Sequence, residues 1–180
     1  MRDAAVELLL ERGLFGVSLE ELAGSTGASA RMLIHYFGSK DGLLTAAIEE
    51  ARRQQLTAAR EHLAQAHVED VADLLEAMWS FIGSPATERH LRLFAEVAAV
   101  SAQDPDRFPG FSEATVRDWL PDLEATLQAA GYDATTAQVQ ATVAFALARG
   151  LLLDRNATGD VKRVDAAQRA VVARLRDAGS

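Results

Sequence analysis

Residues 18–40 read SLEELAGSTGASARMLIHYFGSK, and this stretch decides the fold. Ser18 followed three residues later by Glu21 is the signature of a capping box at a helix start. Gly27 supplies the backbone freedom for a sharp turn, and Ser29 is placed to cap a second helix directly after it. The stretch therefore predicts two short helices joined by a tight turn.

The second helix has two contrasting faces. Four apolar residues recur at helical spacing and are expected to be buried: Ala30, Leu33, Ile34 and Phe37. The opposite face combines a charge, hydrogen-bonding tips and apolar bodies: Arg31, Met32, His35 and Tyr36. A supported helix with such a face suits the DNA major groove, which is about 12 Å wide, and two helices joined this way form a helix-turn-helix. Periodicity alone is explained equally well by a three-helix core with a polar outer face.

The rest of the chain has the composition of a helical globular protein. It contains 180 residues, 49% of them hydrophobic, with four prolines and no cysteine. Alternation typical of strands is nearly missing, so we predict an all-α fold. Disulfides and thiolate metal sites are excluded. No apolar run approaches the roughly 18 residues of a membrane span and the start does not resemble a signal peptide, so we expect a cytoplasmic protein.

The periodic segments predict about nine helices. They lie near residues 2–12, 19–25, 30–37, 40–66, 69–83, 87–102, 112–130, 135–156 and 161–178. The first three form a unit of about fifty residues, and the long helix 40–66 connects it to a second domain. The longest loop is expected at 103–110.

Charge argues against a nonspecific coat on nucleic acid. The net charge is −8, and the first 53 residues hold six Lys/Arg against eight Asp/Glu, a net of −2. A locally placed DNA contact remains compatible with this balance, but the segment lacks the basic excess typical of DNA-binding domains.

Residues 4–44 resemble the DNA-binding domain of the tetracycline-repressor (TetR/AcrR) family of bacterial regulators. The matching features run without a gap: Ala5, Leu8, Glu11-Arg12-Gly13, Phe15-Gly16, Ser18-Leu19, Leu22-Ala23, Gly27-Ala28-Ser29, Leu33, Tyr36-Phe37, Ser39-Lys40 and Leu43-Leu44. The stretch GLLLDRNATGD near 150–160 is also similar to members of the family, but it is far less diagnostic.

The resemblance implies a ligand-responsive, sequence-specific transcriptional regulator, most simply a repressor, that binds a palindromic operator as a homodimer. It implies a helix-turn-helix DNA-binding domain at 1–46 and a ligand-binding and dimerisation domain at 47–180. The DNA contacts that it implies are Ser18, Ser29, Arg31, Met32, His35, Tyr36 and Lys40. No cofactor is expected.

Two departures from the family's pattern bear on affinity. Ile34 stands where many members have a tyrosine that contacts backbone phosphate, so one such contact is expected to be lost. The chain also begins inside the expected first helix, where a basic arm of about ten residues commonly precedes it. Either the start is trimmed or the protein docks with fewer phosphate contacts, which lowers affinity and flattens its salt dependence.

Two long helices carry stripes that suit a dimer interface. The stripe on 135–156 consists of Val139, Val143, Ala146, Leu147 and Gly150, and that on 161–178 of Val164, Ala167, Val171, Val172 and Leu175. Two such helices from each subunit would form a four-helix interface. The alternative is that both stripes pack inside one monomer.

Candidate effector contacts are the mid-helix aromatics Trp79, Phe94, Trp119 and Phe145, with His90 and Arg149 as polar handles. Ordinary core packing of the aromatics, with His90 and Arg149 on the surface, is the alternative. If Arg149 were buried in its apolar run, an anionic ligand or an acidic neighbour would have to pair with it.

The sequence shows no catalytic or metal-binding constellation. The four histidines are scattered, and neither a metal-ligand spacing nor a nucleophile motif is found, so we expect no enzyme and no metal. His62 and His67 are expected to be solvated. Two other functions stay open: a helical small-molecule carrier or partner-binding module that does not bind DNA, and, more remotely, a small α-helical enzyme.

Overall fold

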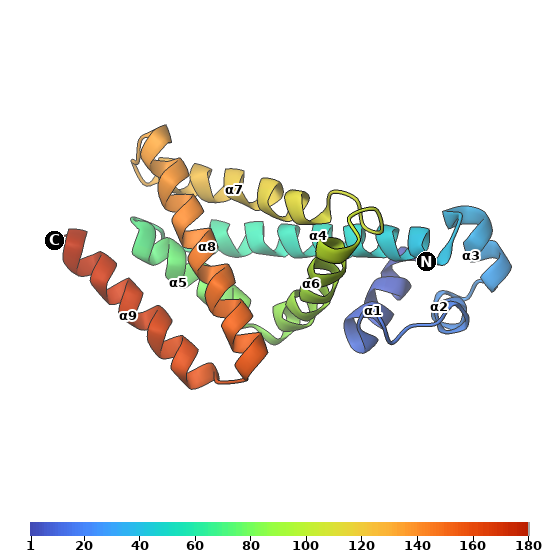
Figure 1. Cartoon of the computed structure of the whole chain (residues 1–180). Helices are drawn as coiled ribbons and strands as arrows, with labels where there is room; N and C mark the ends of the chain where they lie inside the picture. Colours follow the sequence, from blue (N-terminus) through green and yellow to red (C-terminus); the bar gives the residue numbers. More distant parts are fainter. Residues whose placement is uncertain (180) are drawn as a thin grey trace. The chain divides into compact units, whose positions relative to one another are not determined.

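The computed structural model describes residues 1–179, with side chains through residue 177. This part of the chain forms nine α-helices and no strand (Figure 1). Their bounds are α1 Arg2–Arg12, α2 Leu19–Thr26, α3 Ala30–Phe37, α4 Lys40–Gln65, α5 Val71–Ile82, α6 Pro85–Gln103, α7 Phe111–Ala129, α8 Ala134–Thr158 and α9 Val161–Gly179. The predicted all-α class is confirmed, and each predicted helix end lies within two residues of the observed one.

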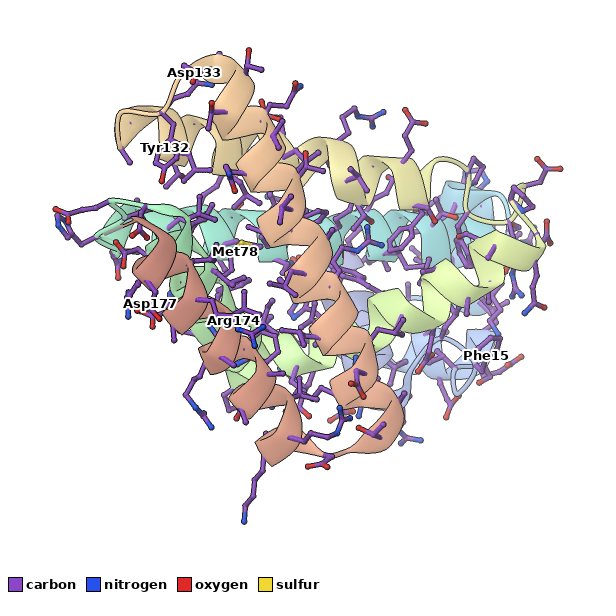
Figure 2. The ribbon with its side chains drawn as sticks, turned by 60° about the vertical axis from the view of Figure 1, so that its left-hand side comes forward. Phe15, Met78, Tyr132, Asp133, Arg174 and Asp177 are labelled. Atoms are coloured by element: carbon purple, nitrogen blue, oxygen red, sulfur yellow. The ribbon has the colours of Figure 1, made fainter. Side chains whose placement is uncertain are left out.

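Side-chain caps explain why these helices begin where they do. The predicted capping box is present: Ser18 Oγ accepts from the Glu21 N–H over 3.1 Å, and Glu21 Oε2 accepts from the Ser18 N–H over 2.8 Å. Asp133, labelled in Figure 2, caps α8 by accepting from the N–H of Thr136 over 3.0 Å. Such caps satisfy donors that would otherwise lack a partner at a helix start.

The chain divides into two compact units. The first contains Met1–Thr57 and Pro85–Thr115, and the second contains Ala58–Ser84 and Val116–Ser180. The first unit thus holds all of residues 1–46 together with α6. These units are defined by packing, whereas the boundary that we expect after residue 46 separates a DNA-binding domain from a ligand-binding domain. That functional boundary stays a prediction.

An apolar core joins five helices of the first unit. One fully or almost fully buried member comes from each of them: Leu9 in α1, Leu22 in α2, Leu33 in α3, Leu44 in α4 and Val97 in α6. The loop between α6 and α7 falls where the sequence predicts it, and its Phe108 is buried in the same core. Burying each such side chain stabilises the fold by roughly 1.5–3 kcal/mol, so this core fixes α3 against its neighbours.

The second unit has a core of its own, in which α5 packs on α8 and α9. Alanines on one face of α8, among them Ala137, Ala141 and Ala144, are buried and allow the helices to approach closely. Val172 of α9 is buried in this core, and Val164 is also buried. The apolar stripe that the sequence predicts as the α9 part of a dimer interface is therefore used largely inside the protomer.

Helix α8 is long and apolar enough, by length and composition, to cross a membrane. Only 28% of its most apolar window is buried in the described part of the chain. One helix of this kind is weak evidence for a membrane segment, because core helices of soluble proteins have the same length and composition.

Candidate nucleic-acid interface

The turn between α2 and α3 is held by local hydrogen bonds. Gly27 ends α2 in the left-handed conformation, with φ +68°, which glycine adopts without strain. Two residues later Ser29 Oγ accepts from the N–H of Met32 over 3.2 Å, as the sequence predicts. Because the Ser18 N–H donates to it, the pKa of the Glu21 carboxyl lies below its ordinary value, and the cap at the start of α2 is charged at neutral pH.

Helix α3 presents the outward face that the sequence predicts. Leu33 is fully buried, and Phe37 is half-buried against the same core. All four residues of the predicted outer face are exposed: Arg31, Met32, His35 and Tyr36. The His35 and Tyr36 rings meet edge to face, with centroids 5.6 Å apart, so the two side chains form one surface.

Ile34 is a correction to the predicted buried face. Its side chain is 37% exposed, because it lies on the flank of α3 and not against the core. An exposed isoleucine cannot donate a hydrogen bond to a phosphate, so the expected loss of one backbone contact stands as a prediction.

Large exposed apolar side chains gather on two helices. In the described part of the chain nine such residues occur, and three of them lie on the eight-residue helix α3: Met32, Ile34 and Tyr36. Three more lie on α8: Val139, Val143 and Leu153. Phe15, the most exposed of the nine, lies at the periphery in the turn after α1 (Figure 2). Concentrated apolar exposure commonly marks a binding surface.

The start of α4 lies directly after α3 and is also accessible. Ser39 Oγ accepts from the N–H of Gly42 over 2.9 Å and so caps the start of α4. A Cβ at Gly42 would lie 2.1 Å from the carbonyl oxygen of Phe37, so only glycine allows α4 to begin so close to the end of α3. The half-buried Lys40 sits at this helix start, where free N–H groups and a positive charge can hold a phosphate.

Side chains of α6 hold the end of α1, which the sequence did not indicate. Glu96 Oε2 accepts from the N–H of Leu14 over 2.6 Å, and an Arg92 guanidinium nitrogen donates to the carbonyl oxygen of Leu10 over 2.9 Å. Arg89 lies 3.6 Å from a Glu7 carboxylate oxygen one turn earlier on α6. We call these three contacts the α6–α1 contact. In two of them the partner is a backbone atom, so the sequence contains no pair of complementary side chains from which they could be predicted.

The candidate effector residues fall into separate groups. Trp119, Phe145 and Arg149 are brought together in the second unit: the Trp119 and Phe145 rings stack with centroids 6.2 Å apart, and the exposed Arg149 guanidinium lies 5.4 Å from the Phe145 centroid. Trp79, also in the second unit, donates from Nε1 to Asp165 over 3.1 Å.

The remaining two candidates, His90 and Phe94, belong to the first unit, where their rings meet edge to face at 6.1 Å. His90 Nδ1 donates to the carbonyl oxygen of Ala86 over 3.0 Å, which leaves Nε2 without a hydrogen bond in a buried position. The role of His90 as a polar handle for an effector stays a prediction.

His62 corrects another expectation. It is half-buried in the second unit, with Nε2 2.8 Å from Ser80 Oγ and its ring 5.6 Å from that of Phe81. It is therefore part of the packing and not solvated, whereas His67 is exposed as predicted.

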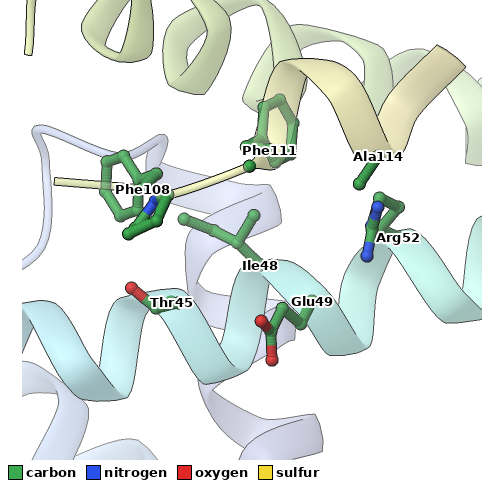
Figure 3. A pocket seen from close by; sticks show the side chains of 9 residues that line it. Thr45, Ile48, Glu49, Arg52, Phe108, Phe111 and Ala114 are labelled. Carbon is green, nitrogen blue, oxygen red and sulfur yellow. The ribbon is translucent and has the colours of Figure 1, made fainter. Parts of the chain in front are cut away.

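A small hollow in the first unit was not predicted. It is lined on one side by α4, including Ile48 and Arg52, and on the other by Phe108, Phe111 and Ala114 (Figure 3). Its cavity volume of ≈ 40 Å³ is far below the roughly 300 Å³ at which drug-sized ligand pockets begin. The hollow beside the α6–α7 loop is therefore too small for a drug-sized effector.

Comparison with known proteins identifies the N-terminal segment. Residues 2–47 match the family described as bacterial regulatory proteins, tetR family. The HTH-type transcriptional regulatory protein RaaS of Mycobacterium tuberculosis is 39% identical over 85 residues, which cover 42% of this chain and 40% of that protein.

Two solved structures resemble the chain over almost its whole length. A transcriptional regulator from Rhodococcus sp. RHA1 has a TM-score of 0.71 at 22% identity, covering 98% of this chain and 94% of that one. The multidrug binding protein EbrR, solved in complex with imidazole, has a TM-score of 0.62 at 21% identity, covering 97% and 86%.

The fold and the geometry of α2 and α3 define a helix-turn-helix protein. Residues 2–47, which contain this motif, match the tetR family of bacterial regulatory proteins. The chain spans 33% to 53% of the length of the curated relatives that it matches. The likeness to the two solved structures shows that the remaining helices share their fold.

Proposed function

We propose that the protein is a ligand-responsive, sequence-specific DNA-binding transcriptional regulator, most simply a repressor. The observation that carries the proposal is α3 itself. Its inner side is anchored by the fully buried Leu33, its N-terminus is capped by Ser29, and its outer side exposes a mixed polar and apolar face. It lies in the segment, residues 2–47, that matches a family of bacterial regulatory proteins.

In this proposal α3 enters the major groove. Arg31, Met32, His35 and Tyr36 lie toward the bases and the adjoining backbone, while the capped starts of α2 and α4, with Ser18 and Lys40, contact phosphates. The net charge of −2 over the first 53 residues implies few phosphate contacts. Binding should therefore depend less steeply on salt than for a basic domain, because each neutralised phosphate adds about 0.9 to the slope of log K against log salt.

The operator would be a palindrome bound by a homodimer, because one recognition helix contacts only a few base pairs. Two copies must then lie about 34 Å apart on the DNA. Four residues of the predicted α8 stripe are exposed and support an interface between two copies, together with the exposed Leu153: Val139, Val143, Ala146 and Gly150. Leu147, the fifth residue of that stripe, packs against the core of the second unit instead. The predicted stripe of α9 packs largely inside the protomer, so the α9 part of the proposed interface would consist of exposed small residues: Ala166, Ala170 and Ala173.

An effector would act by favouring a state whose recognition helices are wrongly spaced for the operator. In the domain that we expect at 47–180, the stacked Trp119 and Phe145 with the nearby Arg149 support a contact with a planar or anionic ligand. Trp79, His90 and Phe94 remain candidate contacts. Imidazole bound to EbrR is a small-molecule complex in a protein of similar fold.

The relatives reported above are transcriptional regulators, which are not enzymes. We further propose a cytoplasmic location, since the operator is there. The rival function is a helical carrier or partner-binding module that keeps the fold without binding DNA, and the acidic N-terminal segment favours it.

Binding to DNA from upstream of the protein's own gene, titrated with salt, separates the two functions. A regulator should bind one sequence at least 100-fold more tightly than scrambled DNA of the same length, with a measurable salt slope. A carrier should show neither sequence preference nor salt dependence, and that result would contradict the proposal.

A further inference from the structure

The outward face of α3 carries an apolar side chain in its first turn. Arg31 and His35, four residues apart, lie about 40° from each other around the helix, and Met32, three residues before His35, lies about 60° to one side of it at 3.6 residues per turn. Met32 is 46% exposed there. An exposed methionine beside polar residues gains little from burial on folding, so its place on this face favours a ligand with an apolar surface.

The position of Met32 along the helix is fixed by the cap. Its backbone N–H donates to Ser29 Oγ over 3.2 Å, which places it in the first turn of α3. In helix-turn-helix proteins the N-terminal residues of the second helix contact base edges, whereas the first helix crosses the DNA backbone. The thioether therefore lies where a base edge would be, and not over the sugar–phosphate backbone.

Among the base edges of the major groove, one group is apolar: the 5-methyl group of thymine. Guanine, cytosine and adenine present donors and acceptors there, and a thioether offers no donor and only a weak acceptor to them. Arg31, the preceding residue, has the donor geometry for O6 and N7 of guanine.

We propose that Met32 is a specificity-determining residue that contacts a thymine methyl group in each half-site of the operator, beside a guanine read by Arg31. The inference rests on the proposed function and deepens it, because it names the chemical feature of the DNA that this chain selects. Ile34, the other exposed aliphatic side chain of α3, lies on the flank next to the buried face and makes no such contact.

The test begins with selection of binding sequences from random duplex DNA by the full chain. Each thymine of the selected sequence is then replaced, in both half-sites at once, by deoxyuridine, which lacks only the methyl group. Affinity is measured by fluorescence anisotropy at one salt concentration. One methyl contact is worth a factor of about four, so the paired replacement should weaken binding about 15-fold at one position of each half-site.

Three variants assign that methyl group to Met32. Met32→Ala and Met32→Gln should bind thymine and deoxyuridine sites equally, and Met32→Gln, which keeps the length of the side chain, should gain affinity for adenine at that position. Ile34→Ala is the matched control and should keep the full discrimination. Circular dichroism checks that all three are folded.

The outcomes are separable. If the parent protein selects a sequence but tolerates deoxyuridine at every position, or if Met32→Ala discriminates as the parent does, this inference is wrong while the proposed function stands. If no sequence is enriched, the proposed function itself fails.

Discussion

Glu96 accepts a hydrogen bond from the backbone N–H of Leu14 over 2.6 Å, across 82 residues of sequence. The carboxylate lies over Gly13, where a Cβ would be 2.8 Å from either carboxylate oxygen. Gly13 ends α1 with φ +75°, so the chain turns at a position where glycine is free of strain. This hydrogen bond joins α6 to the loop between α1 and α2. The carboxylate can lie there only because Gly13 has no Cβ.

Removing the carboxylate should destabilise the first unit. Glu96→Ala leaves the part-buried Leu14 N–H without its partner, which costs about 1–3 kcal/mol in the free energy of unfolding. Urea denaturation followed by circular dichroism measures this change. Glu88→Ala, an exposed position on the same helix, should change it by less than about 0.5 kcal/mol. Equal effects of the two variants would show that the hydrogen bond contributes nothing.

Gly13→Ala tests whether the Glu96 carboxylate requires a glycine beneath it. The alanine would combine a positive φ, costing about 1–2 kcal/mol, with displacement of the Glu96 carboxylate. Gly24→Ala in α2 is the matched control, because a Cβ there meets open space, and it should stabilise the protein by about 0.5–1 kcal/mol. Opposite signs of the two effects in thermal unfolding are the expected result.

The exposed polar tips of α3 should matter for DNA and not for folding. Arg31→Ala and Tyr36→Ala should each weaken operator binding by about 1–3 kcal/mol, a factor of roughly 5 to 150, because each removes a base or phosphate contact. Both side chains are exposed, so helicity and oligomeric state should stay as in the parent. Gel-shift titration and size-exclusion chromatography check the two statements. If both variants bind as the parent does, α3 is not the recognition helix.

Local patterns in the sequence were enough to predict the helices and their caps. Ser18, Glu21 and Ser29 act within three residues of their partners, so spacing alone predicts their hydrogen bonds. Exposure of the α3 face followed from helical periodicity, except at Ile34. That residue lies on the boundary between the two faces, where periodicity does not decide burial.

Contacts between distant segments could not be read in this way. The Glu96–Leu14 hydrogen bond ends on a backbone atom, and any residue type at position 14 except proline would offer the same donor. The spacing of the valines on α9 is equally compatible with a dimer interface and with packing inside one protomer. Val172 proved to be buried within it, in the core that α9 shares with α5 and α8, and Val164 is also buried.

A charge placed in the exposed stripe of α8 should separate the proposed dimer. Val143, which is 54% exposed, would be buried against a second copy, and Val143→Glu would bury a carboxylate there without a partner. We expect a folded monomer by light scattering, with operator affinity reduced at least 100-fold because a half-site alone is bound weakly. Ala125→Glu, on the exposed side of α7, should remain dimeric. A parent protein that is monomeric at every concentration would contradict the interface directly.

Acid should weaken the contact between α5 and α9. Burial raises the pKa of Asp73, but hydrogen bonds from the Glu69 N–H and the Arg176 guanidinium outweigh it and hold the pKa below the ordinary 3.8. A carboxyl group whose pKa is lower in the folded state stabilises the fold above its unfolded pKa, and this contribution is lost as the pH falls through the folded value.

Asp73→Asn removes that charge without changing the shape of the side chain. It should lower the free energy of unfolding by only about 1 kcal/mol at pH 7, because solvent screens the partly exposed Asp73 side chain. The free energies of unfolding of variant and parent should converge as the pH falls below 3.8. Urea unfolding between pH 7 and pH 2.5, roughly the range over which such a group titrates, measures the difference. A difference that stays constant across this range would mean that the amide disturbs packing, because loss of an ionic contact must disappear once the carboxyl group is protonated in both states.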